Sequence, residues 1–405
     1  MNFFLEAPPQ QSGNSSAILL QGFHWNSAGY KSPNWYGKLS NNVDDLANLG
    51  ITHVWFPPAS DSGAKQGYLP RQLNILSSSY GSADDLTNLI KKFKSKGITA
   101  LADIVINHRV GTTDWSDFTN PKWSLYSIVN NDECECGQGN PDTGDGFGGG
   151  RDLDHKNVDE VQNGIKKWFN DVLKPAGFNG IRFDFAKGFS PEYFGMYAES
   201  FNPDFCVGEL WDSFNIDNID ASRQKIVDWI DGTGQRCGAF DFTTKGILNN
   251  VLSNDNFSHL KASDGKPSGV IGWWPSMSVT FVENHDTGAA ESCGTGQSIW
   301  PMPCDKIMLA YAYILTHPGV PTVFYPHVYD WNLKTAIGDL IKVRKDAGIL
   351  STSHVTIAEA KQGLYAATIN GSKKQVAMKI GPNDWTPGSD WNLATAGVNF
   401  AVWTK

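Results

Sequence analysis

The stretch GIRFDFAKG, residues 180–188, shows the pattern that decides the fold of this chain. A short run of apolar, branched and aromatic residues, typical of a buried strand, ends directly in an acidic side chain. The pattern occurs three times, in GIRFDFAKG with Asp184, in FCVGELWD at 205–212 with Glu209, and in TFVENHDTG at 280–288 with Asp286. The catalytic side chains of a parallel α/β barrel lie at the C-terminal ends of its strands. We therefore predict that these three carboxyl groups converge at one end of such a barrel.

Strand-like and helix-like segments alternate along most of the chain. The strand-like segments are AILLQGF (17–23), ITHVWF (51–56), TALADIVI (99–106), NGIRFD (179–184), DFCVGE (204–209), GAFDF (238–242), SVTFVE (278–283) and PTVFY (321–325). Between them, stretches such as ADDLTNLIKKFKSKG (83–97) place apolar residues three and four positions apart, as in a helix with one buried face. Gly50, Gly97 and Gly348 stand where helices are expected to end. Eight such units favour an α/β fold of the closed (β/α)8 TIM-barrel type over an open sheet.

Two segments depart from this alternation. From Arg109 to Asp152 the chain makes a long irregular excursion after strand three, rich in Gly, Asp, Asn and Ser. Such a connection is usually functional or a small subdomain. After residue 349, the segments HVTIAEA, GLYAATI, QVAMKI and NFAVWTK read as short strands separated by turns. We predict a barrel of residues 1–108 and 153–348, an excursion of residues 109–152, and a small C-terminal antiparallel β domain of residues 349–405.

Composition and charge narrow the range of possible partners and protein classes. Hydrophobic residues make up 40% and charged residues 19% of the 405 residues, as is usual for a globular protein. The formal net charge of -9 argues against nucleic acid and membrane as partners, and is compatible with a neutral substrate. No apolar run approaches the roughly 20 residues that span a membrane. The N-terminal segment MNFFLEAPPQQSGNSS lacks a basic start and a long apolar stretch, so we do not expect an intact signal peptide.

The three acids and one arginine suit the cleavage of a glycosidic bond. This reaction builds positive charge on the sugar, and needs a carboxylate beneath the ring and an acid at the leaving oxygen. Arg182 lies two residues before Asp184, hence on the same side of the strand, where it can hold this carboxylate ionised. The apolar flank of Glu209 would raise its pKa and suit a proton donor, and Asp286 could stabilise the charged transition state. One acid at a strand end is usually a cap or a salt-bridge partner, but three in one barrel favour an active site.

Four segments carry a resemblance to a known family. They are ADIVINHR at 102–109, GIRFDFAKG, VGELWD at 207–212 and FVENHDTG at 281–288. In order and spacing they resemble the four signature regions of the α-amylase family of glycoside hydrolases, and QGFHW (21–25) and GYLP (67–70) are also similar to that family. The resemblance covers essentially the whole chain and is closest to plant-type α-amylases and bacterial maltooligosaccharide-forming amylases. It departs at Glu283, where close relatives mostly have Asp.

The resemblance implies a retaining mechanism. Asp184 would be the nucleophile that forms a covalent glycosyl-enzyme, Glu209 the acid and then the base, and Asp286 the stabiliser of the transition state. Arg182 corresponds to the invariant arginine beside the nucleophile. The further substrate-binding residues implied are His108 and His285, which would hydrogen-bond sugar hydroxyls next to the cleavage point, Tyr68, which would stack on that sugar, Lys187, beyond the cleaved bond, and Trp211.

The Asp-rich excursion, with GNPDTGDGFGGGRDLDH at 139–155, suits a calcium ion. Calcium binds six to eight oxygen atoms, several of them from carboxylates or carbonyls. The expected ligands are Asn107, Asp142, Asp145, Asp152 and the carbonyl of Gly188. In the α-amylase family such an ion ties the excursion to the barrel beside the active site, and we predict one Ca²⁺ here. The alternative is a solvated, turn-rich loop.

The six cysteines do not have the spacing of a zinc site, and their even number fits an oxidising compartment. We therefore expect a secreted, extracellular or periplasmic protein. Cys206 and Cys237 match a pair in the bacterial relatives, which implies a disulfide. Cys293 and Cys304 flank a Gly-rich loop and could form another, whereas the spacing of Cys134 and Cys136 is too tight to predict a pair. The tryptophans of GWWP (272–275) match a plant-type surface pair that binds starch, although a core role fits equally well.

The short loop PPASDSGAKQGYLP (57–70) favours endo attack, because exo-acting bacterial relatives carry a longer insertion there. We predict a monomer that performs retaining endo-hydrolysis of α-1,4-glucosidic bonds in starch, glycogen or maltooligosaccharides. The alternatives are a maltooligosaccharide-forming exo-amylase and an α-glucanotransferase, in which a sugar hydroxyl takes the covalent intermediate. A catalytically inactive starch-binding protein is disfavoured because the carboxylates, the arginine and both histidines are present. A phosphate-binding barrel is disfavoured because no Gly-rich loop of the phosphate-binding type lies near strands seven and eight and because the net charge is negative.

Overall fold

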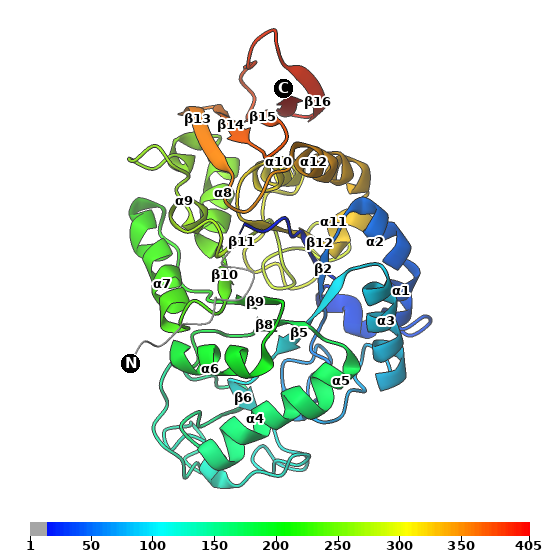
Figure 1. The fold of residues 1–405 in the computed structure, drawn as a ribbon. Coiled ribbons are helices and arrows are strands. Elements are labelled where there is room, and N and C mark those ends of the chain that lie inside the picture. Colours follow the sequence, from blue (N-terminus) through cyan, green and yellow to red (C-terminus); the bar gives the residue numbers. More distant parts are fainter. Residues whose placement is uncertain (1–13) are drawn as a thin grey trace, which may run out of the picture.

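The structure is a computed structural model that describes residues 14–405, and eight of its strands close into a barrel (Figure 1). Neighbouring strands are parallel, in the order β1, β12, β11, β10, β9, β8, β5, β2. The barrel strands are β1 (Leu19–Gln21), β2 (His53–Trp55), β5 (Thr99–Ile104), β8 (Gly180–Phe183), β9 (Phe205–Gly208), β10 (Gly238–Phe240), β11 (Ser278–Phe281) and β12 (Val320–Phe324). Each predicted strand segment contributes one of these strands, and the (β/α)8 barrel is confirmed.

Helices connect the strands and surround the barrel (Figure 1). They are α1 (Trp35–Asn41), α2 (Val43–Leu49), α3 (Ala83–Ser95), α4 (Asn163–Trp168), α5 (Lys174–Ala176), α6 (Pro191–Phe201), α7 (Ile219–Gly232), α8 (Phe242–Asn254), α9 (Val270–Trp273), α10 (Ile307–Thr316), α11 (Tyr325–Tyr329) and α12 (Lys334–Ala347). Short 3₁₀ turns are η2 (Trp25–Gly29), η3 (Leu125–Ser127), η6 (Ile216–Asn218), η7 (Phe257–Leu260) and η8 (Cys304–Lys306), and two π-helical turns, η4 (Val158–Gln162) and η5 (Phe169–Leu173), flank α4. Gly50, Gly97 and Gly348 adopt left-handed backbone with φ of 100°, 71° and 68°, which ends their helices as predicted.

The excursion after β5 returns to the point where it leaves the barrel. It begins with β6 (His108–Arg109), which pairs antiparallel with β7 (Arg151–Asp152) so that His108 lies opposite Asp152. The backbone N–H of Asp145 donates to the Lys187 carbonyl at 3.0 Å, which joins the excursion to the segment after β8. The hairpin of β3 (Asp61–Ser62) and β4 (Pro70–Gln72) lies in the loop after β2. The excursion, which contains most of the predicted calcium ligands, is therefore joined to the segment that follows Asp184.

The C-terminal region is an antiparallel sheet with the strand order β13, β14, β15, β17, β16, and it packs against α10 and α12 (Figure 1). The strands are β13 (His354–Lys361), β14 (Leu364–Asn370), β15 (Gln375–Ile380), β16 (Asn392–Gly397) and β17 (Phe400–Thr404). The predicted β region is confirmed, but the sequence indicated only four of its five strands. The sequence of β16, NLATAG, is mostly exposed at the sheet edge and lacks the apolar alternation of a half-buried strand.

The barrel strands are almost completely buried, and their side chains form the centre of the core. Two charged residues interrupt this apolar interior, Asp103 on β5 and Arg182 on β8, which are register partners in adjacent strands. Within residues 14–405, no helix has the length and apolar character required to cross a membrane. The expectation about a signal peptide concerns a segment that lies almost entirely outside these residues.

Candidate active site

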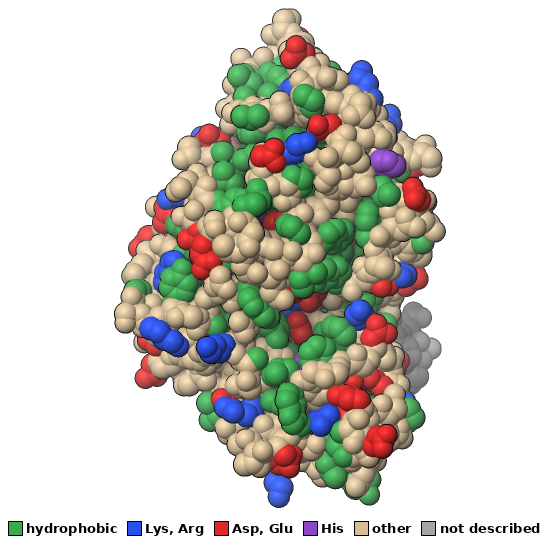
Figure 2. Space-filling model, turned by 180° about the vertical axis from the view of Figure 1, so that it is seen from behind, with side chains coloured by type: hydrophobic (Ala, Val, Ile, Leu, Met, Phe, Trp, Pro, Cys, Tyr) green, Lys and Arg blue, Asp and Glu red, His purple; other side chains and the backbone are tan. Residues whose placement is uncertain are grey.

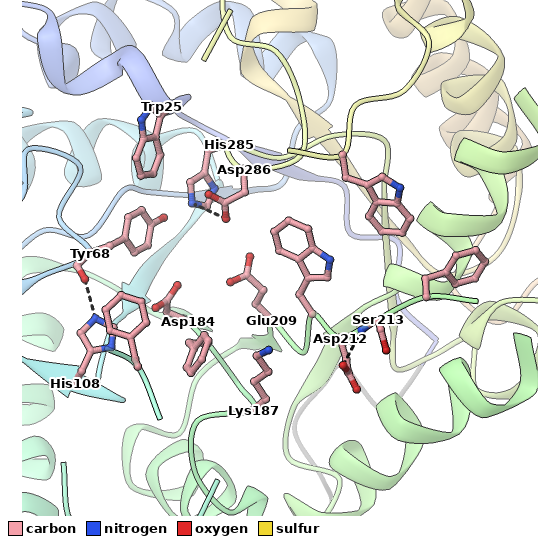
Figure 3. Close-up of a pocket in the computed structure, with 15 residues that line it drawn as sticks. Trp25, Tyr68, His108, Asp184, Lys187, Glu209, Asp212, Ser213, His285 and Asp286 are labelled. Atoms are coloured by element: carbon pink, nitrogen blue, oxygen red, sulfur yellow. Dashed lines mark hydrogen bonds and ion pairs between the residues drawn. The ribbon is translucent and has the colours of Figure 1, made fainter. Parts of the chain in front are cut away.

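The carboxyl ends of β8, β9 and β11 open into a cavity of about 660 Å³. Asp184, Glu209 and Asp286 all line it. Figure 3 shows the three carboxyl groups pointing into one space, with Tyr68 and His108 on one side. Figure 2 shows the corresponding face of the molecule, where hydrophobic side chains surround a hollow with acidic groups in it. The structure thus brings together the three acids that the sequence pattern singled out.

Arg182 is the centre of this arrangement, and its side chain is fully buried. Its Nη1 lies 2.8 Å from Asp184 Oδ1 and 2.7 Å from Asp103 Oδ1. Its Nη2 lies 2.5 Å from Glu209 Oε2. One guanidinium therefore contacts three carboxylates. Asp103 was missed by the sequence reasoning, although an acid within the apolar run of ADIVINHR was a signal that could have revealed it.

Burial sets the protonation of these acids. Loss of hydration raises the pKa of Glu209 to about 8, against the opposing effect of Arg182. Burial likewise raises the pKa of Asp286 to about 7 and that of Asp103 to about 6. Among the residues that the structure describes, Glu209 Oε1 has no hydrogen-bond partner. A carboxyl group that keeps its proton near neutrality and has one uncommitted oxygen can act as a general acid.

The guanidinium itself stays charged. Burial alone would lower the pKa of Arg182, but the carboxylates of Asp103, Glu209 and Asp184 together raise it well above its usual range. The guanidinium also lies over the ring of Trp55, 4.6 Å from its centre. The protein thus has a permanent, buried positive charge among the carboxyl groups that contact Arg182.

The predicted histidines and tyrosine form one wall of the cavity. Gln21 Nε2 donates to His285 Nδ1 at 2.9 Å, so Nε2 of His285 carries the proton on the side of Asp286. His108 Nε2 donates to the Tyr68 carbonyl at 2.8 Å. Burial lowers the pKa of both histidines, which favours neutral rings that can hydrogen-bond a neutral ligand.

Flat aromatic surfaces complete this wall. The Tyr68 ring is nearly parallel to that of His285, with ring centres 5.0 Å apart, and to that of Trp25, with centres 6.4 Å apart. The Tyr68 hydroxyl donates to Asp103 Oδ2 at 2.9 Å, which fixes the ring. Trp25 was not predicted as a site residue, although it ends the matched segment QGFHW. Parallel rings of this kind can stack on the apolar faces of sugars.

The cavity is also lined by Lys187 and Trp211, for which a substrate-binding role stays a prediction, together with Phe214 and Trp300. The rings of Trp211 and Trp300 are nearly parallel, with centres 6.5 Å apart. Lys187 Nζ lies 3.6 Å from Asp145 Oδ2 and is partly exposed. Phe214 and Trp300 come from loops after β9 and β11, and no local motif pointed to them.

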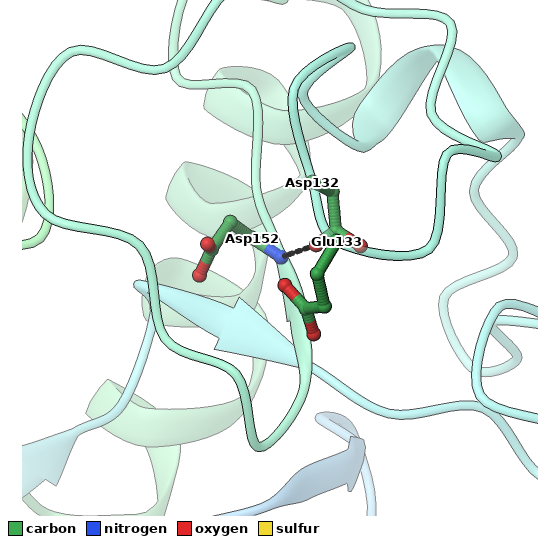
Figure 4. A group of neighbouring side chains, drawn as sticks. All are labelled: Asp132, Glu133 and Asp152. Carbon is green, nitrogen blue, oxygen red and sulfur yellow. Dashed lines mark hydrogen bonds between the residues drawn. The ribbon is translucent and has the colours of Figure 1, made fainter.

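A second acidic group lies in the excursion, where Asp132, Glu133 and Asp152 approach one another (Figure 4). Their carboxylate oxygens lie within 4.8 Å of one another. Asp132 Oδ2 accepts a hydrogen bond from the backbone N–H of Asp152 at 2.8 Å. Asn107 Nδ2 donates to Asp152 Oδ1 at 2.9 Å, which connects this group to the end of β5. Asp132 and Glu133 were missed because they stand between asparagines and cysteines, outside the Gly- and Asp-rich run.

The charge of this group is poorly compensated. Burial raises the pKa of Asp152 to about 7, and the charges of Asp142, Asp132 and Glu133 add to the effect. Arg151 Nη1 lies 3.3 Å from both Asp132 and Glu133, and its side chain is partly exposed. Clustered carboxylate oxygens without nitrogen or sulfur donors are the ligand set that calcium prefers. The residues present therefore fit a hard divalent cation.

The predicted calcium ligands fall at different places around this group. Asn107 contacts Asp152, and Gly188 packs so closely that a Cβ atom there would lie 1.9 Å from Asn107 Oδ1. Asp142 is partly buried, and burial raises its pKa. The Asp145 side chain is 67% exposed and lies beside Lys187 rather than within the group. A ligand role for each of these residues stays a prediction.

All six cysteines are paired. The disulfides Cys206–Cys237 and Cys293–Cys304 agree with the sequence-based expectation. Cys134 and Cys136 also form a disulfide, a pairing that the sequence left open. Glu135 between them adopts left-handed backbone, with φ of 54°, and the two Cα atoms lie 5.1 Å apart.

The tryptophans of GWWP have different surroundings. Trp273 is 38% exposed, and the guanidinium of Arg223 lies 3.5 Å from the centre of its ring. Trp274 is partly buried and packs against the core. A surface role for this pair stays a prediction.

Comparisons with known proteins agree with the geometry. The family model "Alpha amylase, catalytic domain" matches residues 25–127, and "Alpha-amylase C-terminal beta-sheet domain" matches residues 346–404. "Probable alpha-amylase 2" of Arabidopsis thaliana is 43% identical over 408 residues, covering 96% of this chain and 94% of that protein. "Glucan 1,4-alpha-maltotetraohydrolase" of Stutzerimonas stutzeri is 31% identical over 405 residues, covering 95% of this chain and 71% of that protein. Among solved structures, the cyclomaltodextrin glucanotransferase CldA shares the fold with a TM-score of 0.71 at 17% identity, over 96% of this chain and 99% of CldA.

Proposed function

The chain belongs to the α-amylase family of glycoside hydrolases, and on this premise we propose that it hydrolyses internal α-1,4-glucosidic bonds of starch and related glucans with retention of configuration. One observation carries the proposal, namely that Arg182 contacts both Asp184 and Glu209 at the floor of the cavity. Two carboxylates that share one guanidinium are close together, which supports the separation of about 5–5.5 Å of retaining enzymes over the wider spacing of inverting ones.

Each carboxyl group has a role that its surroundings suit. In the first step, Asp184 attacks the anomeric carbon, and the bond to the leaving oxygen breaks as Glu209 gives that oxygen its proton. In the second, Glu209 takes a proton from water, whose oxygen attacks the anomeric carbon and releases Asp184. Arg182 holds the carboxylate of the nucleophile in place through the contact of 2.8 Å with Asp184 Oδ1, and Asp286 stabilises positive charge on the sugar.

The cavity walls suit a glucan chain. Neutral His108 and His285 can hydrogen-bond sugar hydroxyls, and the ring of Tyr68 can stack on the sugar next to the cleaved bond. Lys187 and Trp211 would contact the chain beyond that bond. Among the described residues that line the cavity, Lys187 is the one lysine or arginine, which suits an uncharged substrate.

We further propose that the excursion holds Ca²⁺, through Asp132, Glu133 and Asp152, with Asn107 and Asp142 next to them. The ion would supply positive charge that stabilises the excursion against the barrel. Because His108 directly follows Asn107, an ordered excursion also fixes a residue of the cavity wall. The three disulfides favour an oxidising compartment for this protein.

Formation of one maltooligosaccharide from chain ends is the second candidate. It is supported by the 31% identity to a protein named as a maltotetraohydrolase. The short loop of residues 57–70 after β2 favours internal attack instead, because it forms little more than the small β3–β4 hairpin.

Product analysis distinguishes these functions. Soluble starch and maltooligosaccharides would be incubated with the protein, and products followed over time by chromatography. Endo-hydrolysis gives a ladder of sizes with rapid loss of iodine colour, a single early product indicates exo-hydrolysis, and products longer than the substrate indicate transfer. Asp184→Asn and Glu209→Gln should each lose nearly all activity while remaining folded, whereas Glu199→Gln, at an exposed ion pair with Arg236, should keep it. Near-normal rates for either site variant would refute the assignment.

A further inference from the structure

A loop of residues 289–304 follows β11 and lies beside Asp286, the carboxylate to which we assign transition-state stabilisation. Cys293 and Cys304 form a disulfide across this loop, with their Cα atoms 6.1 Å apart. A cross-link over so short a segment limits the conformations that the residues between the cysteines can adopt. Side chains of this loop can therefore serve as fixed contacts for the residues next to it.

Two hydrogen bonds join the loop to Asp286. The Gln297 amide donates from Nε2 to Asp286 Oδ1 at 2.5 Å, and the backbone N–H of Ile299 donates to the Asp286 carbonyl at 2.9 Å. On the other side, Asn284 Oδ1 accepts from the backbone N–H of Asp286 at 3.0 Å. The loop thus holds both the backbone and the carboxylate of this residue.

Buried polar contacts anchor the C-terminal part of the loop. Glu283 accepts hydrogen bonds from Lys245 Nζ, at 3.0 Å, and from the backbone N–H of Met302. Asn249 Nδ2 donates to the carbonyl of Trp300 at 3.3 Å. Glu283 is the position at which the sequence departs from the family resemblance. The contacts of Glu283 with Lys245 and Met302 tie the loop to α8, so Gln297 is presented by a segment that is fixed at both ends.

The two oxygens of Asp286 have different neighbours. Oδ1 accepts from Gln297, whereas Oδ2 lies 3.5 Å from His285 Nε2 on the cavity side. A carboxylate held at one oxygen cannot rotate freely, so the other oxygen keeps its direction towards the bound sugar. We propose that Gln297 is a positioning residue that holds Asp286 in the orientation needed at the transition state, a role that rests on the proposed glycosidase function.

In addition to the amide of Gln297, which does not ionise, several ionisable groups face Asp286. They are Arg182, Asp184, Asp103, Glu209, His285 and Tyr68. An amide donor favours the ionised form of the carboxylate that it contacts. Gln297 therefore acts in the same sense as Arg182 and against the neighbouring acids, and this gives its role an electrostatic signature in addition to a geometric one.

Three variants test the proposal with a maltooligosaccharide substrate. Gln297→Ala removes the donor, and we expect kcat to fall about 10- to 100-fold, as for other displacements of a catalytic group, with KM and the melting temperature little changed. Gln297→Glu keeps the shape of the side chain but replaces the donor by a carboxylate. It should be at least as impaired as Gln297→Ala at neutral pH and should regain activity at lower pH, where the introduced carboxyl group is protonated and can donate. Gln224→Ala removes a matched amide–carboxylate contact, to Asp228 at 2.7 Å, on the exposed face of α7, and should leave kcat unchanged.

A merely structural role predicts a different result. In that case Gln297→Glu would retain wild-type kcat, or Gln297→Ala would lose activity only in proportion to its loss of stability, and either finding overturns the proposal. Crystal structures of the wild type and Gln297→Ala supply a readout that needs no substrate. We expect the Asp286 carboxylate to rotate in the variant, and an unmoved carboxylate would count against Gln297 even if the glucan substrate proved wrong.

Discussion

Two acidic groups in this protein solve the same electrostatic problem differently. At the barrel mouth, Asp103, Asp184 and Glu209 surround the fully buried guanidinium of Arg182. In the excursion, the carboxylates of Asp132, Glu133 and Asp152 gather with the partly exposed Arg151 beside them. Buried carboxylates without counter-charge are costly. The first group contains its own permanent cation, and the second has a deficit of positive charge that a metal ion can fill.

The difference follows from what each group has to do. Bond cleavage requires one carboxylate ionised and one protonated at the same moment, so the balancing charge has to stay in place throughout the reaction. A positive charge that only holds the excursion against the barrel does not have to stay in place throughout a reaction. A cation from solution can therefore supply it. The positions of the two arginines agree with this difference, since Arg182 lies within a barrel strand and Arg151 at the edge of an irregular segment.

Removal of Arg182 should have the largest effect. Arg182→Leu leaves buried carboxylates without their partner, which costs about 3–5 kcal/mol of unfolding free energy. The activity should fall by roughly 10³-fold or more, since a preorganised charge at the reacting carboxylates is lost. Denaturant unfolding and kcat on maltooligosaccharides measure the two effects.

Arg344→Leu is the matched control for this variant. Arg344 is also buried, but its guanidinium donates to the carbonyls of Leu315, His317 and Gly319 and contacts no carboxylate of residues 14–405. It should lower stability and leave kcat of the folded fraction intact. Retention of normal kcat in Arg182→Leu would mean that the guanidinium does not balance the catalytic acids.

Much of the arrangement at the barrel mouth could be predicted from the sequence, because part of it follows from residues that are close together in the chain. Apolar runs ending in acids gave the barrel strands and the three catalytic candidates, and the i, i+2 spacing of Arg182 and Asp184 placed both on one side of β8. Asp103 could not be assigned in the same way, since its contact with Arg182 depends on the register of two strands.

The functional residues of the excursion and the loops were missed for another reason. Asp132 and Glu133 lie 20 and 19 residues before Asp152, and an irregular segment has no periodicity that predicts which of its acids will meet. Gln297 contacts Asp286 only because a disulfide-closed loop returns to β11. The edge strand β16 was missed because its exposed face carries no hydrophobic pattern.

Chelation should have the second-largest effect and acts only on the excursion. Removal of Ca²⁺ by EGTA should lower the unfolding free energy by roughly 2–4 kcal/mol, the range expected when an ion is present at 100 to 1,000 times its Kd. Thermal melts with and without added Ca²⁺ measure the change. Asp152→Asn should abolish the response, and Asp145→Asn, whose carboxylate lies beside Lys187, should preserve it. A melting curve that EGTA leaves unchanged would contradict the calcium proposal.

The pH dependence tests the barrel mouth alone. Burial raises the pKa of Glu209 to about 8, so this acid is protonated below that pH and loses its proton above it. Since the protonated form is the donor, kcat/KM should fall roughly tenfold per pH unit above about 8. An aryl maltooligosaccharide with a good leaving group needs less protonation, and its basic limb should be much flatter. Equal basic limbs for both substrates would argue that another group controls this pH dependence.

Removal of Arg151 should have the smallest effect, and it sharpens the contrast with Arg182. The Arg151 side chain is 18% exposed and lies 3.3 Å from the buried Asp132 and from the exposed Glu133, so Arg151→Met should cost roughly 1–2 kcal/mol, between the values for a surface ion pair and a buried one. Because the guanidinium and Ca²⁺ attract the same oxygens, its loss should also tighten Ca²⁺ binding, which titration calorimetry of the EGTA-treated protein would detect. A loss as large as that of Arg182→Leu, or weaker Ca²⁺ binding, would mean that Arg151 is a permanent counter-charge of the excursion, and that the two acidic groups are balanced in the same way.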